Sequence, residues 1–139
     1  MLKINQQACA LKIISAFADI LDAELSKAAI GLNPDCAFSS GAVINFRDPD
    51  YSFESGGFHP VEVYIDGLGV LQYVTDFSLV GKPPFVELAK ELDFSFELNL
   101  FGHMGIDFPI AKGEELFEIF QKNFVSYYQM DVFKVEVSE

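Results

Sequence analysis

Helical and strand-like patterns divide the chain into a first helix, a strand-rich middle and a last helix. Over residues 5–30, apolar residues recur at steps of three and four, which predicts an N-terminal helix in one or two pieces. Gly31 is a natural residue to end this helix, and Asn33–Pro34 marks the break after it. Residues 113–129 return to the helical period and predict a C-terminal helix.

The middle of the chain alternates between apolar and polar residues, which is typical of strands that bury one face. Pro109 cannot donate a hydrogen bond to a neighbouring strand, so the segment around it is predicted to lie at a sheet edge or a strand end. A short strand is also expected after the last helix. The predicted strands cover residues 42–47, 61–66, 70–80, 92–100, 106–110 and 132–137.

A hairpin is predicted around the turn sequence GLG at residues 67–69. A three-residue turn there places Ile65 opposite Leu71 and Val63 opposite Tyr73. Both apolar sets then lie on one side, as a hairpin with one buried face requires.

This order of elements predicts an α+β fold. It consists of an N-terminal helix, an antiparallel meander sheet of about 5–6 strands, a C-terminal helix and a short final strand, with helices covering one face of the sheet. No repeat or linker interrupts the 139 residues, so a single domain over residues 1–139 is predicted.

Composition narrows the classes of partner. Half of the residues are apolar, 14% are aromatic, and the net charge is −12. The chain is too apolar to be disordered, and charged residues interrupt the apolar runs too often for a membrane span. The negative charge disfavours nucleic acids and anionic membrane surfaces. No signal peptide is visible and Cys9 and Cys36 lack metal-ligand spacing, so a cytoplasmic protein with reduced thiols is expected.

Polar residue types concentrate in residues 46–63, with the sequence FRDPDYSFESGGFHPVEV. Asp48, Asp50 and Ser52 alternate like the first ligands of a calcium loop. The pattern then fails, because His59 stands where such a loop requires a glutamate that binds the ion through both oxygens. No metal site is therefore predicted in this stretch.

A catalytic interpretation of the same stretch uses His59 as a base. Glu62 or Asp50 would be its partner, and Ser52 the nucleophile. No nucleophile motif surrounds the serine, so no catalytic residue and no cofactor is predicted.

A structural interpretation explains more of these residues. Arg47 is the only arginine of the chain, and its guanidinium is expected to hold the loop through neighbouring carboxylates or carbonyls. Pro49 suits the second position of a turn that Asp48 caps, and Gly56–Gly57 allow positive φ. Whether the stretch is structural or functional stays open. Its candidate binding residues are Arg47, Asp48, Asp50, Tyr51, Glu54, His59 and Glu62.

The predicted C-terminal helix carries an aromatic stripe from Phe117 to Tyr128. One interpretation is that the stripe packs on Phe94 and Phe96 of the sheet. The alternative is that part of it is exposed and forms an interface between copies of the chain.

The pattern F-R-D-x-x-Y-S-x-E-x-G-G-x-H-P-V-E covers residues 46–62, and the segments LQYVTDF, LDFSFEL and FQKNFVSYYQMDVFKV follow it. With these segments the chain resembles an uncharacterised bacterial domain-of-unknown-function family of short acidic proteins. The resemblance extends over roughly residues 40–139. The pattern marks the family and implies no activity.

At the level of fold, that family is similar to the acidic mitochondrial matrix glycoprotein family. Those proteins have terminal helices around a twisted antiparallel sheet, assemble as rings of three and bind many ligands without a shared catalytic centre. The resemblance implies a non-enzymatic acidic module that binds a protein partner or forms a homo-oligomer, a trimer included. The negative charge, and not the resemblance, predicts that neither nucleic acid nor membrane is a partner. The alternative is a small-ligand-binding protein or a hydrolase-like enzyme that uses Arg47, Asp50, His59 and Glu62.

Overall fold

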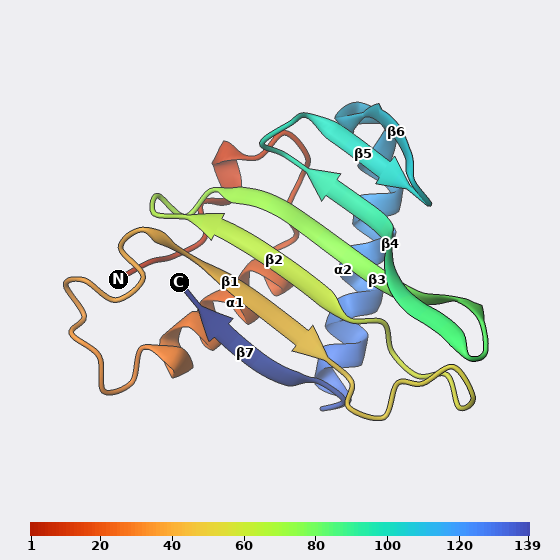
Figure 1. The fold of residues 1–139 in the computed structure, drawn as a ribbon. Coiled ribbons are helices and arrows are strands. Elements are labelled where there is room, and N and C mark those ends of the chain that lie inside the picture. Colours follow the sequence, from red (N-terminus) through yellow and green to blue (C-terminus); the bar gives the residue numbers. More distant parts are fainter.

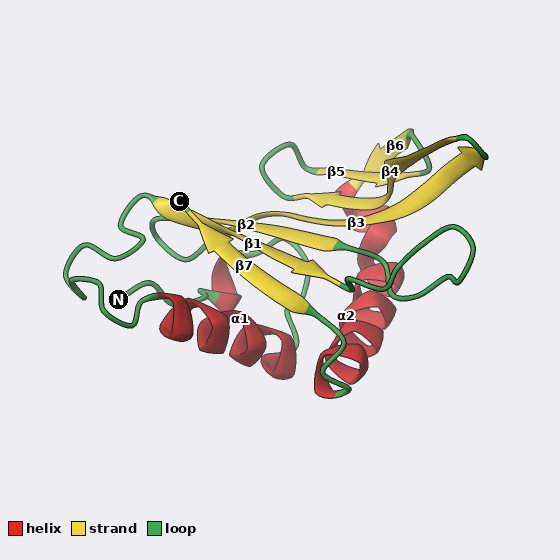
Figure 2. Cartoon of the chain, turned by 60° about the horizontal axis from the view of Figure 1, so that its bottom comes forward, coloured by secondary structure: helices red, strands yellow, loops and turns green.

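The computed structural model describes residues 1–139 as a seven-stranded antiparallel sheet with two α-helices on one of its faces (Figure 1, Figure 2). Across the sheet the strand order is β6-β5-β4-β3-β2-β1-β7. The helices are α1 (Ser15–Ala28) and α2 (Glu114–Gln129), with short 3-10 helices η1 (Gln6–Ala8) and η2 (Ile110–Gly113). The strands are β1 (Gly41–Arg47), β2 (Val61–Asp66), β3 (Leu71–Lys82), β4 (Phe85–Ser95), β5 (Leu100–His103), β6 (Ile106–Pro109) and β7 (Lys134–Ser138).

The predicted α+β class is confirmed. Strands β1 to β6 follow one another as a meander, and β7 returns after α2 to pair with β1 at the other edge. The strand around Pro109 lies at an edge, as predicted. Neither α1, with 14 residues, nor α2, with 16, is long and apolar enough to cross a membrane.

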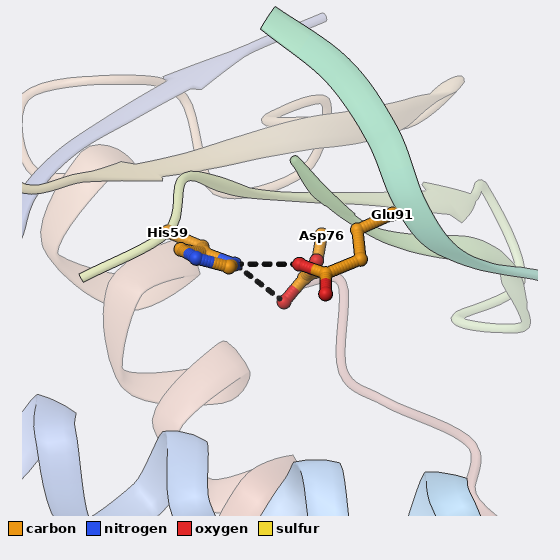
Figure 3. Close-up of side chains that lie close together, drawn as sticks. All are labelled: His59, Asp76 and Glu91. Atoms are coloured by element: carbon orange, nitrogen blue, oxygen red, sulfur yellow. Dashed lines mark ion pairs between the residues drawn. The ribbon is translucent and has the colours of Figure 1, made fainter. Parts of the chain in front are cut away.

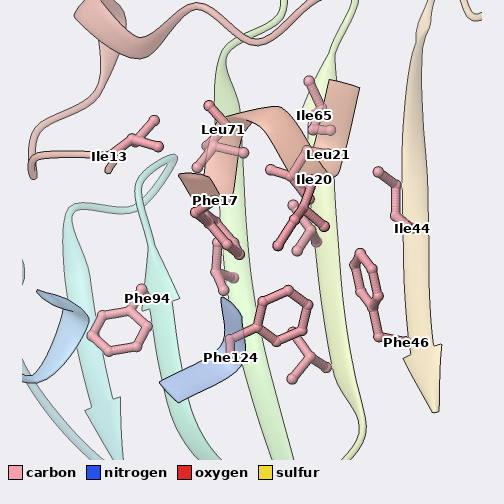
Figure 4. Packing of buried hydrophobic residues seen from close by; sticks show 14 of the residues in the cluster. Ile13, Phe17, Ile20, Leu21, Ile44, Phe46, Ile65, Leu71, Phe94 and Phe124 are labelled. Carbon is pink, nitrogen blue, oxygen red and sulfur yellow. The ribbon is translucent and has the colours of Figure 1, made fainter. Parts of the chain in front are cut away.

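Phe124 of α2 joins both helices to the sheet. Its ring centre lies 5.4 Å from that of Phe17 in α1 and 4.8 Å from that of Phe46 in β1, and both contacts are edge-to-face. On a third side it stacks on Phe133, which precedes β7, at 5.4 Å. Figure 4 shows Phe124 among the aliphatic and aromatic side chains that fill the space between helices and sheet. These contacts form one core under the covered face.

The first part of the predicted N-terminal helix is wrong. The α-helix begins at Ser15, and the residues before it form no helix apart from η1. The fully buried Gln121 of α2 holds this segment: its Oε1 accepts the N–H of Ile14 at 2.9 Å, and its Nε2 donates to the carbonyl of Lys12 at 3.0 Å. These backbone groups are therefore paired with a distant side chain instead of with a helical turn.

The predicted β2–β3 hairpin forms, but its register changes after the first pair. Ile65 lies opposite Leu71 as expected, whereas Val63 lies opposite Val74 and not opposite Tyr73. A β-bulge inserts Gln72, whose carbonyl accepts the N–H groups of both Phe96 and Glu97 beyond β4. One extra residue reverses the faces of the rest of the strand.

The strand predicted over residues 92–100 is two strands. β4 ends at Ser95, residues 96–99 form a turn, and β5 begins at Leu100. Asn99 has φ of 55°, a left-handed conformation that Asn tolerates and that ends an extended run. Alternation alone does not reveal this turn, because Leu98 continues the apolar pattern although its side chain is 65% exposed.

Phe124→Ala is expected to lower the free energy of unfolding by about 3–5 kcal/mol, because it leaves a cavity among rings from three other segments. Urea denaturation measures this change. Phe85, which is 85% exposed at the start of β4, is the control, and Phe85→Ala should change the same quantity by about 0.5 kcal/mol or less. Equal losses in the two variants would show that Phe124 is not the centre of the core.

Candidate functional site

The 46–63 stretch forms the end of β1, a long loop and the start of β2. Its loop is organised by the buried carboxylate of Asp48. Oδ1 of Asp48 accepts the N–H of Asp50 at 2.9 Å, and Oδ2 accepts the N–H of Phe58 at 3.0 Å. The carbonyl of Asp48 also accepts the N–H of Tyr51, which closes the predicted turn with Pro49 at its second position.

Gly57 is required where the loop returns to this carboxylate. Its φ is 129°, and a Cβ atom at this position would lie 2.8 Å from Oδ2 of Asp48. A side chain here would therefore strain the backbone and displace the capping carboxylate. The predicted roles of Asp48 and the glycine pair in the loop are confirmed.

The expected role of Arg47 is wrong. Its side chain is exposed and forms no hydrogen bond or ion pair with Asp48, Asp50, Glu54 or any other residue. Asp48 replaces it as the centre of the loop because a carboxylate accepts hydrogen bonds from the backbone N–H groups that a tight loop leaves unpaired. Asp50 and Glu54 are also exposed.

Tyr51 connects the loop to the sheet and positions His59. Its hydroxyl oxygen accepts the N–H of Leu79 in β3 at 2.9 Å. Its ring centre lies 5.4 Å from that of His59, with the planes tilted by 42°. The imidazole is thus supported on one side by an aromatic ring that is itself fixed to β3.

His59 faces two carboxylates that come from neighbouring strands, Asp76 of β3 and Glu91 of β4 (Figure 3). Its Nδ1 lies 3.0 Å from Oε2 of Glu91 and 3.5 Å from Oδ2 of Asp76. The second oxygen of Asp76, Oδ1, is buried without a hydrogen-bond partner. The cluster thus holds two acidic groups and one imidazole, with an acceptor oxygen left unsatisfied.

Two β-bulges turn the carboxylates toward the helices. The bulge at Gln72 places Asp76 opposite Val61, on the covered face of the sheet. A second irregularity lies between β3 and β4, where Asp76 pairs with Leu92 but Phe77 pairs with Lys90, so that Glu91 is the extra residue. Bulges commonly redirect a side chain in this way.

The Asp76 carboxylate beside the imidazole raises the pKa of His59 above its ordinary value of 6.5, and the negative charge of Glu91 adds to this effect. Partial burial opposes the shift without cancelling it. The charged imidazolium form of His59, which balances the two carboxylates, is therefore more favoured than it would be for an isolated histidine.

The His59–Asp76–Glu91 cluster lines one wall of a cleft of about 380 Å³ between α2, the sheet and the 57–60 loop. Most of the lining is apolar. Phe58 and Tyr127 both line the cleft, and their ring centres lie 4.7 Å apart. From α2, the cleft is lined by Leu116, Ile119, Phe120, Asn123, Phe124 and Tyr127.

The other candidate residues of the stretch lie elsewhere. Arg47 and Glu62 line a separate hollow with Lys134 and Glu136. Glu62 accepts a hydrogen bond from the Tyr73 hydroxyl, and burial together with this carboxylate raises the pKa of Tyr73. The structure therefore does not bring Arg47 and Glu62 together with His59.

The sequence pattern predicts His59 as a candidate residue but pairs it with Asp50 or Glu62. Asp76 and Glu91 were missed because each lies on a later strand and reaches His59 only through the sheet register. Uninterrupted alternation in LQYVTDFSLV groups Leu71 with Tyr73 and so directs Asp76 away from the covered face. No local sequence pattern indicates the bulge at Gln72, which turns Asp76 to the covered face instead.

The fold and site define a two-layer α+β protein with the His59–Asp76–Glu91 cluster beside an apolar cleft. Comparison with known proteins agrees with the α+β class. The model of a family described as Protein of unknown function (DUF2787) matches residues 15–138. The chain belongs to this family, which confirms the predicted resemblance to an uncharacterised family. No curated protein matches the chain.

Two solved structures share the fold over almost the whole chain. The hypothetical protein VC0508 from the Vibrio cholerae VSP-II pathogenicity island is 28% identical, with a TM-score of 0.79 over 95% of this chain and 98% of that one. The conserved hypothetical protein VC1805 from the V. cholerae pathogenicity island VPI-2 is 31% identical, with a TM-score of 0.77 over 94% and 97%. It is described as sharing structural homology with the human P32 protein, which confirms the predicted fold-level similarity to the acidic mitochondrial matrix glycoprotein family.

Asp48→Ala should lower the free energy of unfolding by about 1–3 kcal/mol, because the N–H groups of Asp50 and Phe58 lose their acceptors. Arg47→Ala is the neighbouring control and should change it by about 0.5 kcal/mol or less. Urea denaturation of both variants compares the two residues. If Arg47→Ala were the more damaging change, the arginine and not the aspartate would hold the loop.

The stabilising effect of His59 should depend on pH. Because its folded-state pKa is raised, the charged imidazole contributes fully below the unfolded value of 6.5, and this contribution is lost as pH rises through the higher folded value. The difference in melting temperature between the wild type and His59→Gln, measured with a chelator from about pH 5.5 to about pH 9, should shrink as pH rises. A difference that stays constant would contradict the pairing with Asp76 and Glu91.

Proposed function

We propose that this protein is a non-enzymatic acidic module that binds a protein partner in the cleft beside α2. The cleft-facing α2 surface, defined as Leu116, Ile119 and Tyr127, carries the proposal. These side chains are 36%, 54% and 37% exposed, although they adjoin the buried core. They occupy one stripe of the helix and all line the same cleft.

Partly exposed apolar side chains around a concave surface are typical of recognition sites. Tyr127 offers a large ring with a polar end, and Phe58 adds a second ring on the facing loop. The neighbouring face of α2 is buried, and its side chains hold the helix on the sheet: Phe117, Phe120 and Phe124. A partner would therefore meet a rigid surface and lose little free energy in ordering it.

Charge favours a partner with basic residues. The net charge of the chain is −12, and exposed Glu115 and Glu118 lie beside the α2 surface. Asp76 and Glu91 line the opposite wall of the cleft. The occupant that fits is an apolar protein segment flanked by lysine or arginine, with apolar contacts supplying most of the affinity and charge guiding the encounter.

The similarity of VC1805 to the human P32 protein supports a non-enzymatic binding module within this fold. The alternative of a ligand-binding protein or hydrolase loses support because Arg47 and Glu62 lie apart from His59. Cys9 and Cys36 are unpaired, which fits a partner in the reducing cytoplasm.

Affinity capture from the native cell should compare the wild type with Ile119→Lys and Leu68→Lys. Ile119 lies in the cleft, and Leu68, which is 82% exposed at the β2–β3 turn, is the matched control. Ile119→Lys places a charge on the α2 surface that repels a basic apolar segment. It should lower recovery of the partner at least about tenfold, whereas Leu68→Lys should leave it unchanged; a tenfold loss corresponds to about 1.4 kcal/mol.

Binding of the purified partner should also weaken as salt rises, because charge guides the encounter. Cross-links from α2 should map to an apolar segment with flanking lysine or arginine. The proposal fails if Ile119→Lys retains the partner, if Leu68→Lys loses it equally, or if the bound species is nucleic acid. Recovery of further copies of the chain alone, with light scattering showing an oligomer, would replace the hetero-partner with self-association.

A further inference from the structure

The His59–Asp76–Glu91 cluster has the composition and spacing of a metal site. One ligand atom from each residue can be chosen so that all three lie within 4.8 Å of one another. They come from the loop before β2, from β3 and from β4, so they surround a common point instead of following one strand. Figure 3 shows the imidazole and both carboxylates turned toward that point.

We propose that this cluster binds a zinc ion through His59 Nδ1, Asp76 and Glu91. Zinc holds nitrogen and carboxylate ligands at about 2.0–2.2 Å in a tetrahedron, so neighbouring ligand atoms lie about 3.3–3.6 Å apart. The distance from His59 Nδ1 to Asp76 Oδ2, 3.5 Å, lies in this range, and that to Glu91 Oε2, 3.0 Å, is a few tenths of an ångström shorter. Small movements of the side chains therefore bring these ligand atoms to zinc spacing.

The buried Oδ1 atom of Asp76 is an independent reason to expect a cation. A buried carboxylate oxygen without a donor leaves a desolvation cost that is not compensated. The Asp76 side chain is only 14% exposed, so water compensates it poorly. A cation bound at the carboxylate stabilises the negative charge shared by both of its oxygens.

The supporting contacts fit a preformed site. Asp76 and Glu91 are held by paired strands, and the Tyr51 ring packs against the imidazole while its hydroxyl contacts β3. Such surroundings orient metal ligands before the ion arrives. Calcium and magnesium prefer six or more oxygen ligands, whereas one imidazole with two carboxylates suits zinc. Because all three side chains line the cleft, a fourth ligand would come from water in the cleft or from a donor atom of a partner.

Isothermal titration of the full chain, stripped of metal and then titrated with Zn²⁺ alone, tests the site. One ion per chain should bind, and Ca²⁺ or Mg²⁺ in excess should not displace it. Asp76→Asn, Glu91→Gln and His59→Gln should each weaken binding at least about tenfold. Asp93→Asn is the matched control: Asp93 lies on β4 two residues from Glu91, pairs with Thr75 on the other face of the sheet, and should keep the wild-type affinity.

Circular dichroism of each variant shows whether it is folded. The visible absorption of bound Co²⁺ is a second readout, which reports the coordination of the ion and not its binding constant. Co²⁺ bound to the wild type should give the strong visible absorption of a four-coordinate ion, and this absorption should be absent in His59→Gln. The zinc site is overturned if folded wild type binds no Zn²⁺, if Asp93→Asn weakens binding as much as Asp76→Asn, or if several ions bind weakly and Ca²⁺ displaces them. Partner capture with Ile119→Lys is independent of this titration, so either proposal can fail alone.

Discussion

The aromatic contacts of Phe124 are the constraint on which the rest of the structure depends. This one ring meets Phe17 of α1, Phe46 of β1 and Phe133 before β7. Because it packs into three segments at once, it sets how close α2 lies to the sheet and how α1 lies beside it. Phe124 also lines the cleft, so the packing that stabilises the fold shapes the surface offered to a partner.

The chemistry within this frame depends on two departures from regular strand pairing. The extra residue Gln72 turns Asp76 to the covered face, and the extra residue Glu91 brings a second carboxylate beside it. Neither acid would meet His59 in an uninterrupted ladder, because alternate side chains would point to the opposite side. The loop built around Asp48 completes the cluster, because it places Tyr51 against β3 and His59 beside the carboxylates of β3 and β4.

The family pattern of residues 46–62 acquires a physical explanation from these contacts. Asp48 and Gly57 shape the loop, Tyr51 attaches it to β3, and the imidazole of His59 lies in the cleft. The first part of the stretch thus builds the loop, and its end places the imidazole of His59 in the cleft. The two solved structures described above share the fold over almost their whole length, and both are described as hypothetical proteins. The cleft and the His59–Asp76–Glu91 cluster beside it are therefore the features whose substitution tests the function.

The amino-acid sequence by itself determined the α+β class, most of the strands, both helices and the turn residues Pro49, Gly56 and Gly57, because these follow from local periodicity and backbone preference. It also marked His59. Only the tertiary structure decided the irregular N-terminal segment that Gln121 holds, the end of β4 at Ser95, the exposed position of Arg47, and the meeting of His59 with Asp76 and Glu91. The reason is physical: these features arise from hydrogen bonds and strand register between segments far apart in the chain, where a single inserted residue reverses which side chains face the core.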